Sequence, residues 1–200
     1  MKQILTLAML SAISVLPIFA QEKEKPKEEA GSMMPPQALN DSLFTWMIGE
    51  WTGHTESPMG KTDDYQKIEW NLDNQFVIVS YDSKFTSLNA DQIKSMASRM
   101  KMPEDEMRKM MAKGYKGLGE FTINPMNGEF MGYWFDNMRG VYKGMGKQEG
   151  AKLTTTWESP RGTETRTMEK MSDDKMVESF KETDPSGTVM EGKSEWTRKK

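Results

Sequence analysis

The sequence predicts an all-β fold: an antiparallel meander barrel of about ten strands, with a helical hairpin inserted between two of them. Three observations lead to this prediction. From Trp51 onward, short segments of alternating apolar and polar residues are separated by turns rich in Gly, Pro, Asn and Asp. One segment, residues 89–114, breaks this rhythm with helical spacing. The chain has no cysteine, so packing alone must hold the domain together.

Residues 1–20 are organised like a signal peptide. Lys2 supplies the positive end, an apolar run follows as far as Phe19, and Ala20 ends an acceptable cleavage site. Residues 21–37 are strongly charged and lack periodic apolar residues, which predicts a disordered linker. We therefore expect a mature domain of residues 38–200 that is exported, periplasmic or secreted, and has no transmembrane segment.

The net charge of the chain is −3, and residues of both signs are interspersed along it. A protein that binds phosphate backbones needs a basic face, and no such face is apparent. We do not expect nucleic-acid binding.

The domain is predicted to begin with a helical turn that leads into the first strand. Phe44, Met47 and Ile48 have the spacing of one helical face. Gly49 can adopt backbone angles that other residues avoid, so the chain can turn there before Trp51 enters the sheet.

The clearest strand is residues 66–72, in which Ile68, Trp70 and Leu72 fall on one face. Residues 76–81 are apolar on both faces, which predicts that the outer face is covered as well. The later predicted strands cover residues 115–123, 129–135, 141–145, 153–157, 163–171, 176–180 and 189–198.

Residues 89–114 are predicted to form the helical hairpin, laid over the outer face of the barrel or over one of its mouths. Asn89 is a suitable N-cap, Pro103 suits the start of a second helix, and Gly114 suits its end. The expected lid face of the two helices consists of Ile93, Met96, Met100, Met107, Met110 and Met111.

Several short motifs resemble known barrels. Gly49-x-Trp51 in the first strand and Arg198 in the last are similar to the calycin superfamily, which includes lipocalins. The segments around Leu43–Trp51, Glu69-Trp70-x-Leu72, Tyr133-Trp134-Phe135-Asp136 and Trp196-x-Arg198 resemble an exported bacterial lipocalin-like domain family of unknown function. The resemblance implies that Trp51 packs under the Arg198 guanidinium and closes one end, both residues being structural.

No cofactor is predicted, after two alternatives have been weighed. His54 is the only histidine and would be needed as a haem ligand, but it has the opposite strand parity to Trp51 and should point outward. A Cu(I) site of thioethers would use Met96, Met100, Met102, Met107, Met110 and Met111, although flexible apolar packing explains them more simply. One histidine and no cysteine also leave the usual catalytic triads and zinc sites without their parts, so no enzyme activity is predicted.

The candidate ligand-binding residues are aromatic and charged residues on strands: Trp70, Tyr81, Tyr133, Trp134, Trp157, Phe180, Arg166 and Glu178. The aromatic residues could instead fill the core, and Arg166 and Glu178 could form an outward-facing pair. We expect a non-enzymatic barrel that holds a small hydrophobic or amphipathic ligand in its lumen. The alternative is a structural or interaction protein of the cell envelope, with a filled barrel and a methionine-rich helical surface for a protein partner.

Overall fold

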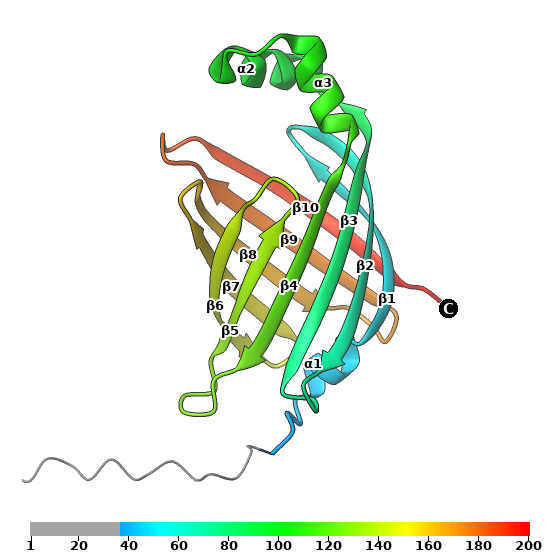
Figure 1. The fold of residues 1–200 in the computed structure, drawn as a ribbon. Coiled ribbons are helices and arrows are strands. Elements are labelled where there is room, and N and C mark those ends of the chain that lie inside the picture. The colour runs from blue at the N-terminus through cyan, green and yellow to red at the C-terminus, as the bar shows by residue number, and fades with distance from the viewer. Residues whose placement is uncertain (1–36) are drawn as a thin grey trace, which may run out of the picture. The chain divides into compact units, whose positions relative to one another are not determined.

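The structure, a computed structural model, describes residues 37–200, so the predicted signal peptide and almost all of the linker lie outside the described residues. Ten antiparallel strands form a closed barrel in the order β1-β10-β9-β8-β7-β6-β5-β4-β3-β2 (Figure 1). The strands are β1 (Gly49–Ser57), β2 (Gly60–Asn71), β3 (Phe76–Leu88), β4 (Tyr115–Ile123), β5 (Phe130–Asp136), β6 (Val141–Glu149), β7 (Lys152–Ser159), β8 (Gly162–Lys170), β9 (Lys175–Thr183) and β10 (Val189–Arg198). The helices are α1 (Ser42–Met47), α2 (Ala90–Met100) and α3 (Glu104–Ala112). The predicted all-β barrel with an inserted helical hairpin is confirmed.

Helix α1 lies across one end of the barrel, which we call the closed end. It begins at Asp41, whose Oδ1 accepts a hydrogen bond from the Phe44 N–H at 2.8 Å. Leu43, Phe44 and Met47 are buried in one core cluster with inward residues of the strands, such as Trp157. The half of the barrel next to α1 is therefore filled with apolar side chains.

Arg198 closes this end from the last strand. Its guanidinium carbon lies 4.2 Å from the centroid of a Trp51 ring, and Trp51 is fully buried. Its Nη1 donates to the Ile48 carbonyl at 2.6 Å, its Nη2 donates to the Trp46 carbonyl, and its Nε donates to the Asp173 carbonyl at 3.2 Å. The carbonyls at the end of a helix lack partners within the helix, so one side chain both covers the Trp51 ring and caps α1.

Glycines make room for the large inward side chains. A Cβ atom at Gly144 would lie 2.5 Å from the Trp157 ring, and one at Gly53 would lie 2.6 Å from the Trp196 ring. In both cases the glycine is the direct cross-strand neighbour of the aromatic residue. The same pairing recurs at Gly119 with Trp134, Gly132 with Phe121 and Gly192 with Phe180. The register of the barrel thus sets where each ring can lie.

The helical hairpin lies over the other end of the barrel, which we call the mouth (Figure 1). Asn89 caps α2 by accepting hydrogen bonds from the N–H groups of Asp91 and Gln92, and Gly114 ends the insert with a φ of +75°. Arg99 of α2 forms an ion pair of 3.5 Å with Asp184 in the β9–β10 turn. Of the two positions predicted for the hairpin, the mouth is therefore correct.

The apolar face of the hairpin packs against the rim of the mouth. Ile93 and Met107 are fully buried in a cluster with Met59 of the β1–β2 turn, and Met190 of β10 packs against it. Met96, Met102, Met110 and Met111 border this cluster. Met100 does not belong to it, because its side chain points to solvent and is 53% exposed. Among residues 37–200, no helix is long and apolar enough to span a membrane.

Candidate functional site

The half of the interior nearest the mouth, which we call the upper lumen, contains charged and polar side chains, whereas the closed end is filled with apolar ones. Its inward-facing side chains are Asp64, Tyr81, Tyr115, Trp134, Glu164, Arg166, Glu178, Phe180 and Glu182. They face inward because they share strand parity with buried residues further along the same strands, as Arg166 does with Met168.

Arg166 is the centre of an ion-pair network on the lumen wall. Its Nε lies 2.9 Å from Glu164 Oε1, and its Nη1 lies 3.3 Å from Glu178 Oε2. The indole N–H of Trp196 also donates to Glu178 Oε2, at 3.0 Å. Burial alone would lower the pKa of Arg166, but the two carboxylates raise it above its usual value. Arg166 therefore remains a fixed positive charge within the barrel.

Space remains beside this network. The Arg166 side chain is 32% accessible and that of Glu164 is 23% accessible, although both point into the barrel. The side chains of a filled interior, such as Met176 at the closed end, have almost no accessible surface. The inward-facing charges of the upper lumen therefore keep contact with solvent, unlike the side chains of the closed end.

An aromatic wall lies beside the charges. The ring centroid of Tyr81 is 5.8 Å from that of Tyr115, 5.9 Å from that of Trp134 and 6.0 Å from that of Trp196, all edge-to-face. The indole N–H of Trp134 donates to the Tyr115 hydroxyl at 2.6 Å. Burial raises the pKa of both Tyr81 and Tyr115, so both hydroxyls stay protonated and keep a proton to donate. Phe180 adds a ring whose centroid is 5.3 Å from the Arg166 guanidinium carbon.

Asp64 of β2 adds a buried carboxylate to the wall. It accepts hydrogen bonds from the Thr55 hydroxyl at 2.5 Å, the Thr62 hydroxyl at 2.8 Å and the Tyr81 hydroxyl at 3.2 Å. The Thr55 hydroxyl also lies 2.7 Å from that of Ser194 on β10. Three hydroxyl donors satisfy the Asp64 carboxylate, and the same network orients the Tyr81 ring through its hydroxyl.

Glu182 stands nearest the mouth, directly across the strands from Glu164. Burial, followed by the negative charges of Glu164 and Asp184, raises the pKa of Glu182. Within the described part of the chain, the Glu182 side chain forms no hydrogen bond or ion pair. The carboxylates of Glu164, Glu178 and Glu182 outnumber Arg166, and Arg161, whose charge also acts on Glu182, is paired with Asp136. This side of the upper lumen therefore carries excess negative charge.

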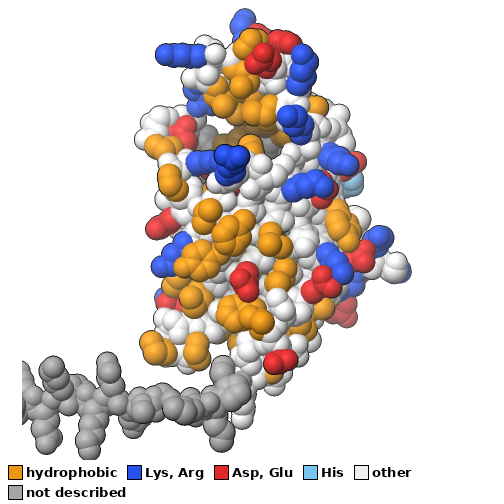
Figure 2. Space-filling model, in the orientation of Figure 1, with side chains coloured by type: hydrophobic (Ala, Val, Ile, Leu, Met, Phe, Trp, Pro, Cys, Tyr) orange, Lys and Arg blue, Asp and Glu red, His pale blue; other side chains and the backbone are white. Residues whose placement is uncertain are grey.

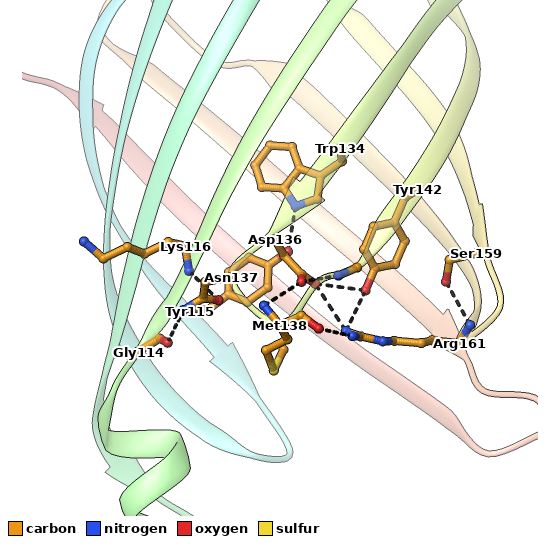
Figure 3. A network of polar contacts seen from close by, with 11 residues as sticks. Gly114, Tyr115, Lys116, Trp134, Asp136, Asn137, Met138, Tyr142, Ser159 and Arg161 are labelled. Atoms are coloured by element: carbon orange, nitrogen blue, oxygen red, sulfur yellow. Dashed lines mark hydrogen bonds and ion pairs between the residues drawn. The ribbon is translucent and has the colours of Figure 1, made fainter.

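The polar network in Figure 3 holds two turns at the rim together. The Asp136 carboxylate, which is inaccessible to solvent, accepts from the N–H groups of Met138 and Gly140 at 2.8 and 2.6 Å. Arg161, from the β7–β8 turn, lies 3.3 Å from Asp136 and donates to the Met138 carbonyl at 2.6 Å. Because every one of these contacts is internal, we interpret the network as structural.

Five of the eight predicted ligand-binding residues come together in the upper lumen: Tyr81, Trp134, Arg166, Glu178 and Phe180. Trp157 and Trp70 belong to the core instead, where Trp157 contacts Phe121 and Phe130, and Trp70 contacts Phe44. The prediction for Tyr133 is corrected: its side chain points out of the barrel and is 45% exposed, because it alternates with the inward-facing Trp134.

Sequence reasoning missed Asp64, Tyr115, Glu164 and Glu182. The available signal was parity. Asp64 lies four residues before Ile68 and therefore on the same face, and Tyr115 has the parity of Phe121. Glu164 and Glu182 alternate in step with Arg166 and Glu178. A charged residue facing a barrel interior runs against the usual burial preference, which is why the pattern was not extended to them.

His54 lies on the outer surface, as its parity predicts, with 78% of its side chain accessible and Nδ1 2.7 Å from Asp63 Oδ1. Its imidazole does not reach the lumen. The methionines at the mouth pack as an apolar cluster. Among residues 37–200, no three His, Asp or Glu side chains are placed so as to hold a metal ion together.

Comparison with known proteins supports the fold. The chain is similar to an S-type phycobiliprotein lyase from Guillardia theta, with a TM-score of 0.50 and 8% identity over 78% of this chain and 90% of that chain. The fold is a calycin-like β-barrel. The chain is also similar to a designed fluorescence-activating β-barrel, at a TM-score of 0.39 and 9% identity over 80% of this chain and 99% of that chain. A protein of unknown function from the DUF3598 family of Nostoc punctiforme matches at a TM-score of 0.26 and 9% identity, over 78% of this chain and 98% of that chain. No protein-family model and no curated protein matches the sequence.

Proposed function

We propose that this chain is an exported, non-enzymatic carrier that holds a small amphipathic molecule in the upper lumen, with the helical hairpin as its lid. One observation carries the proposal: Arg166, Glu164 and Glu178 point into the barrel yet keep accessible surface. Buried charges are costly unless they are paired or used on a ligand. Together with the rings of Tyr81 and Phe180, they offer both an apolar surface and polar partners.

The excess of carboxylates suggests which end of the ligand lies here. Glu182 forms no ion pair among the described residues, and the two arginines whose charges act on it, Arg166 and Arg161, are paired with other carboxylates. A positively charged or hydrogen-bond-donating group would be attracted to this side, and aromatic faces also favour cations. We therefore expect a ligand whose polar end is an amine or another donor group.

The alternative, an envelope protein that binds a partner through the methionine-rich helices, has less support. The apolar face of α2 and α3 is turned onto the mouth, where Met107 is fully buried against the barrel. A face used in this way favours a lid. Export itself remains a proposal that rests on Lys2 and the apolar run that follows it.

A titration with two matched probes tests the proposal. The probes are a dansyl-labelled alkylamine and the dansyl-labelled alkanoic acid of equal chain length. We expect saturable dansyl enhancement with the amine and weaker binding of the acid. Glu178→Gln should weaken the binding of the amine, whereas Lys193→Gln, a change on the outer wall, should not. Equal, non-saturating signals from both probes would contradict the proposal.

A further inference from the structure

The outer wall of the barrel carries one concentrated hydrophobic area. Eleven large hydrophobic residues are exposed among residues 37–200, and six of them lie on β4, β5, β6 or the turn between β5 and β6. These six residues, which we call the β4–β6 patch, are Leu118, Tyr133, Phe135, Met138, Val141 and Met145. In Figure 2, hydrophobic side chains gather over the wall that β4 and β5 form in Figure 1.

The strand register makes the patch continuous. Leu118, Phe135 and Val141 stand side by side across β4, β5 and β6. One step along the strands, Tyr133 stands between Glu120 of β4 and Lys143 of β6. With about half of each side chain exposed, the six residues present on the order of 500 Å² of surface, near the upper end for the largest patch of a typical monomer. A patch of this size is often functional.

We propose that the β4–β6 patch is the interface of a homodimer, with a second copy of this chain as its occupant. Glu120, Tyr133 and Lys143 form a row across β4, β5 and β6. The negative charge of Glu120 lies on one side of the Tyr133 ring, and the positive charge of Lys143 lies on the other. A two-fold axis that runs along the strands over Tyr133 exchanges these two sides. Glu120 of each copy then faces Lys143 of the other, so the surface is complementary to itself.

The charges in this row are available for such a contact. Among the described residues, neither Glu120 nor Lys143 forms an ion pair, whereas Lys116 near the edge of the patch already pairs with Asp82 at 2.9 Å. Glu120 and Lys143 stand two strands apart, about 10 Å between backbones, so Tyr133 separates them within one copy. Glu158 of β7 is the next residue along the row beyond Lys143, and it is not paired with Lys143 either.

Other occupants fit less well. The barrel is closed, so these strands have no free edge to which a peptide strand could be added. With Glu120, Lys143 and Glu158, the row carries one net negative charge, so it does not attract an anionic membrane surface. For the dimer, the apolar area of the β4–β6 patch is smaller than the roughly 800 Å² that each partner contributes to a standard interface, and the charged row supplies part of the remainder.

Sedimentation velocity of the purified protein tests this interface independently of any ligand, because the patch lies outside the barrel. We expect a monomer–dimer equilibrium between about 1 and about 100 µM, within the range found for interfaces of this size. Tyr133→Ser should weaken dimerisation at least about tenfold. Val189→Ser, which removes an equally exposed apolar side chain from β10, is the matched control and should leave dimerisation unchanged.

A charge exchange tests the two-fold arrangement itself. Glu120→Lys and Lys143→Glu alone should each weaken the dimer at least about tenfold by placing like charges together, and the double variant should restore it. Circular dichroism checks that each variant is folded. Because the variants are made at three outward-facing sites, Glu120, Tyr133 and Lys143, the test does not depend on the folding of any single variant. A monomer throughout the concentration range, a dimer insensitive to these changes, or a double variant without recovery would overturn the proposal. So would a monomer that binds vesicles of neutral lipid through Tyr133.

Discussion

Replacing Arg198 with alanine tests how the closed end is held. The change removes a cation over the Trp51 ring and three hydrogen bonds to carbonyls, two of them at the end of α1. The cation–π contact contributes about 1 kcal/mol, and hydrogen bonds from a charged donor contribute about 1 kcal/mol each when partly exposed. We expect the free energy of unfolding to fall by about 4 kcal/mol, which lowers Tm by roughly 8–16 °C in a domain of this size.

The assay is urea and thermal unfolding followed by tryptophan fluorescence and circular dichroism. Lys199→Ala is the matched control, because Lys199 is the next residue and its ammonium makes only exposed contacts, an ion pair with Glu50 and a cation–π contact with the Tyr65 ring, so Tm should hardly change. Arg198→Lys should recover part of the loss, since an ammonium keeps the charge but cannot reach three carbonyls. If Arg198→Ala costs no more than Lys199→Ala, the idea that this residue closes the barrel is wrong.

Three further predictions concern the wall and the lid. Gly144→Ala should lower the free energy of unfolding by about 1–3 kcal/mol in urea denaturation, because its Cβ would overlap the Trp157 ring; a neutral result would contradict the cross-strand pairing. Arg99→Glu should accelerate hydrogen exchange in α2 and α3 by breaking the ion pair with Asp184, while Tm stays close to that of the wild type; unchanged exchange would show that the pair does not hold the hairpin. The raised pKa of Glu182 favours the native state when its carboxyl is protonated, so the free energy of unfolding should fall as pH rises through the ordinary glutamate pKa toward the raised one. Glu182→Gln should remove that part of the pH dependence, and an unaltered pH profile would refute the assignment.

The barrel could be predicted from sequence because its strands alternate regularly and its turns carry strong signals. Trp51 and Arg198 were paired through the resemblance to calycins, and the structure places them 4.2 Å apart. The hairpin was predictable because helical spacing between residues 89 and 114 interrupts the strand pattern. Local periodicity therefore carried most of the architecture.

Strand ends were less predictable. β2 begins at Gly60 and β3 continues to Leu88, well beyond the predicted segments 66–72 and 76–81. In the parts of β2 and β3 that lie outside the predicted segments, the buried side chains are polar: Thr62, Asp64 and Ser83. The hydrophobic alternation that marks a strand is therefore absent there. Leu72 was predicted to face inward, but it lies in a turn with a φ of 47° and is exposed. The prediction that the outer face of residues 76–81 is covered is wrong, because Ile78 is only half-buried there and Ser80 is exposed.

The candidate site was only partly predictable for the same reason. Parity placed Arg166 and Glu178 on one face but could not say whether that face was inside, since charges usually point outward. Tyr133 and Trp134 are adjacent and must face opposite sides, so no single-strand pattern allows both in one pocket. Which of the two lies inside depends on the register with β4, where Gly119 stands directly across from Trp134 and leaves room for its ring.

Native mass spectrometry of the protein purified from its own compartment tests the central claim most directly. We expect the wild-type protein to carry a small molecule. Glu178→Gln should reduce its occupancy, whereas Lys193→Gln on the outer wall should retain it. A wild-type protein with only its own polypeptide mass, and with no saturable uptake of the dansyl amine afterwards, would contradict a ligand-holding upper lumen.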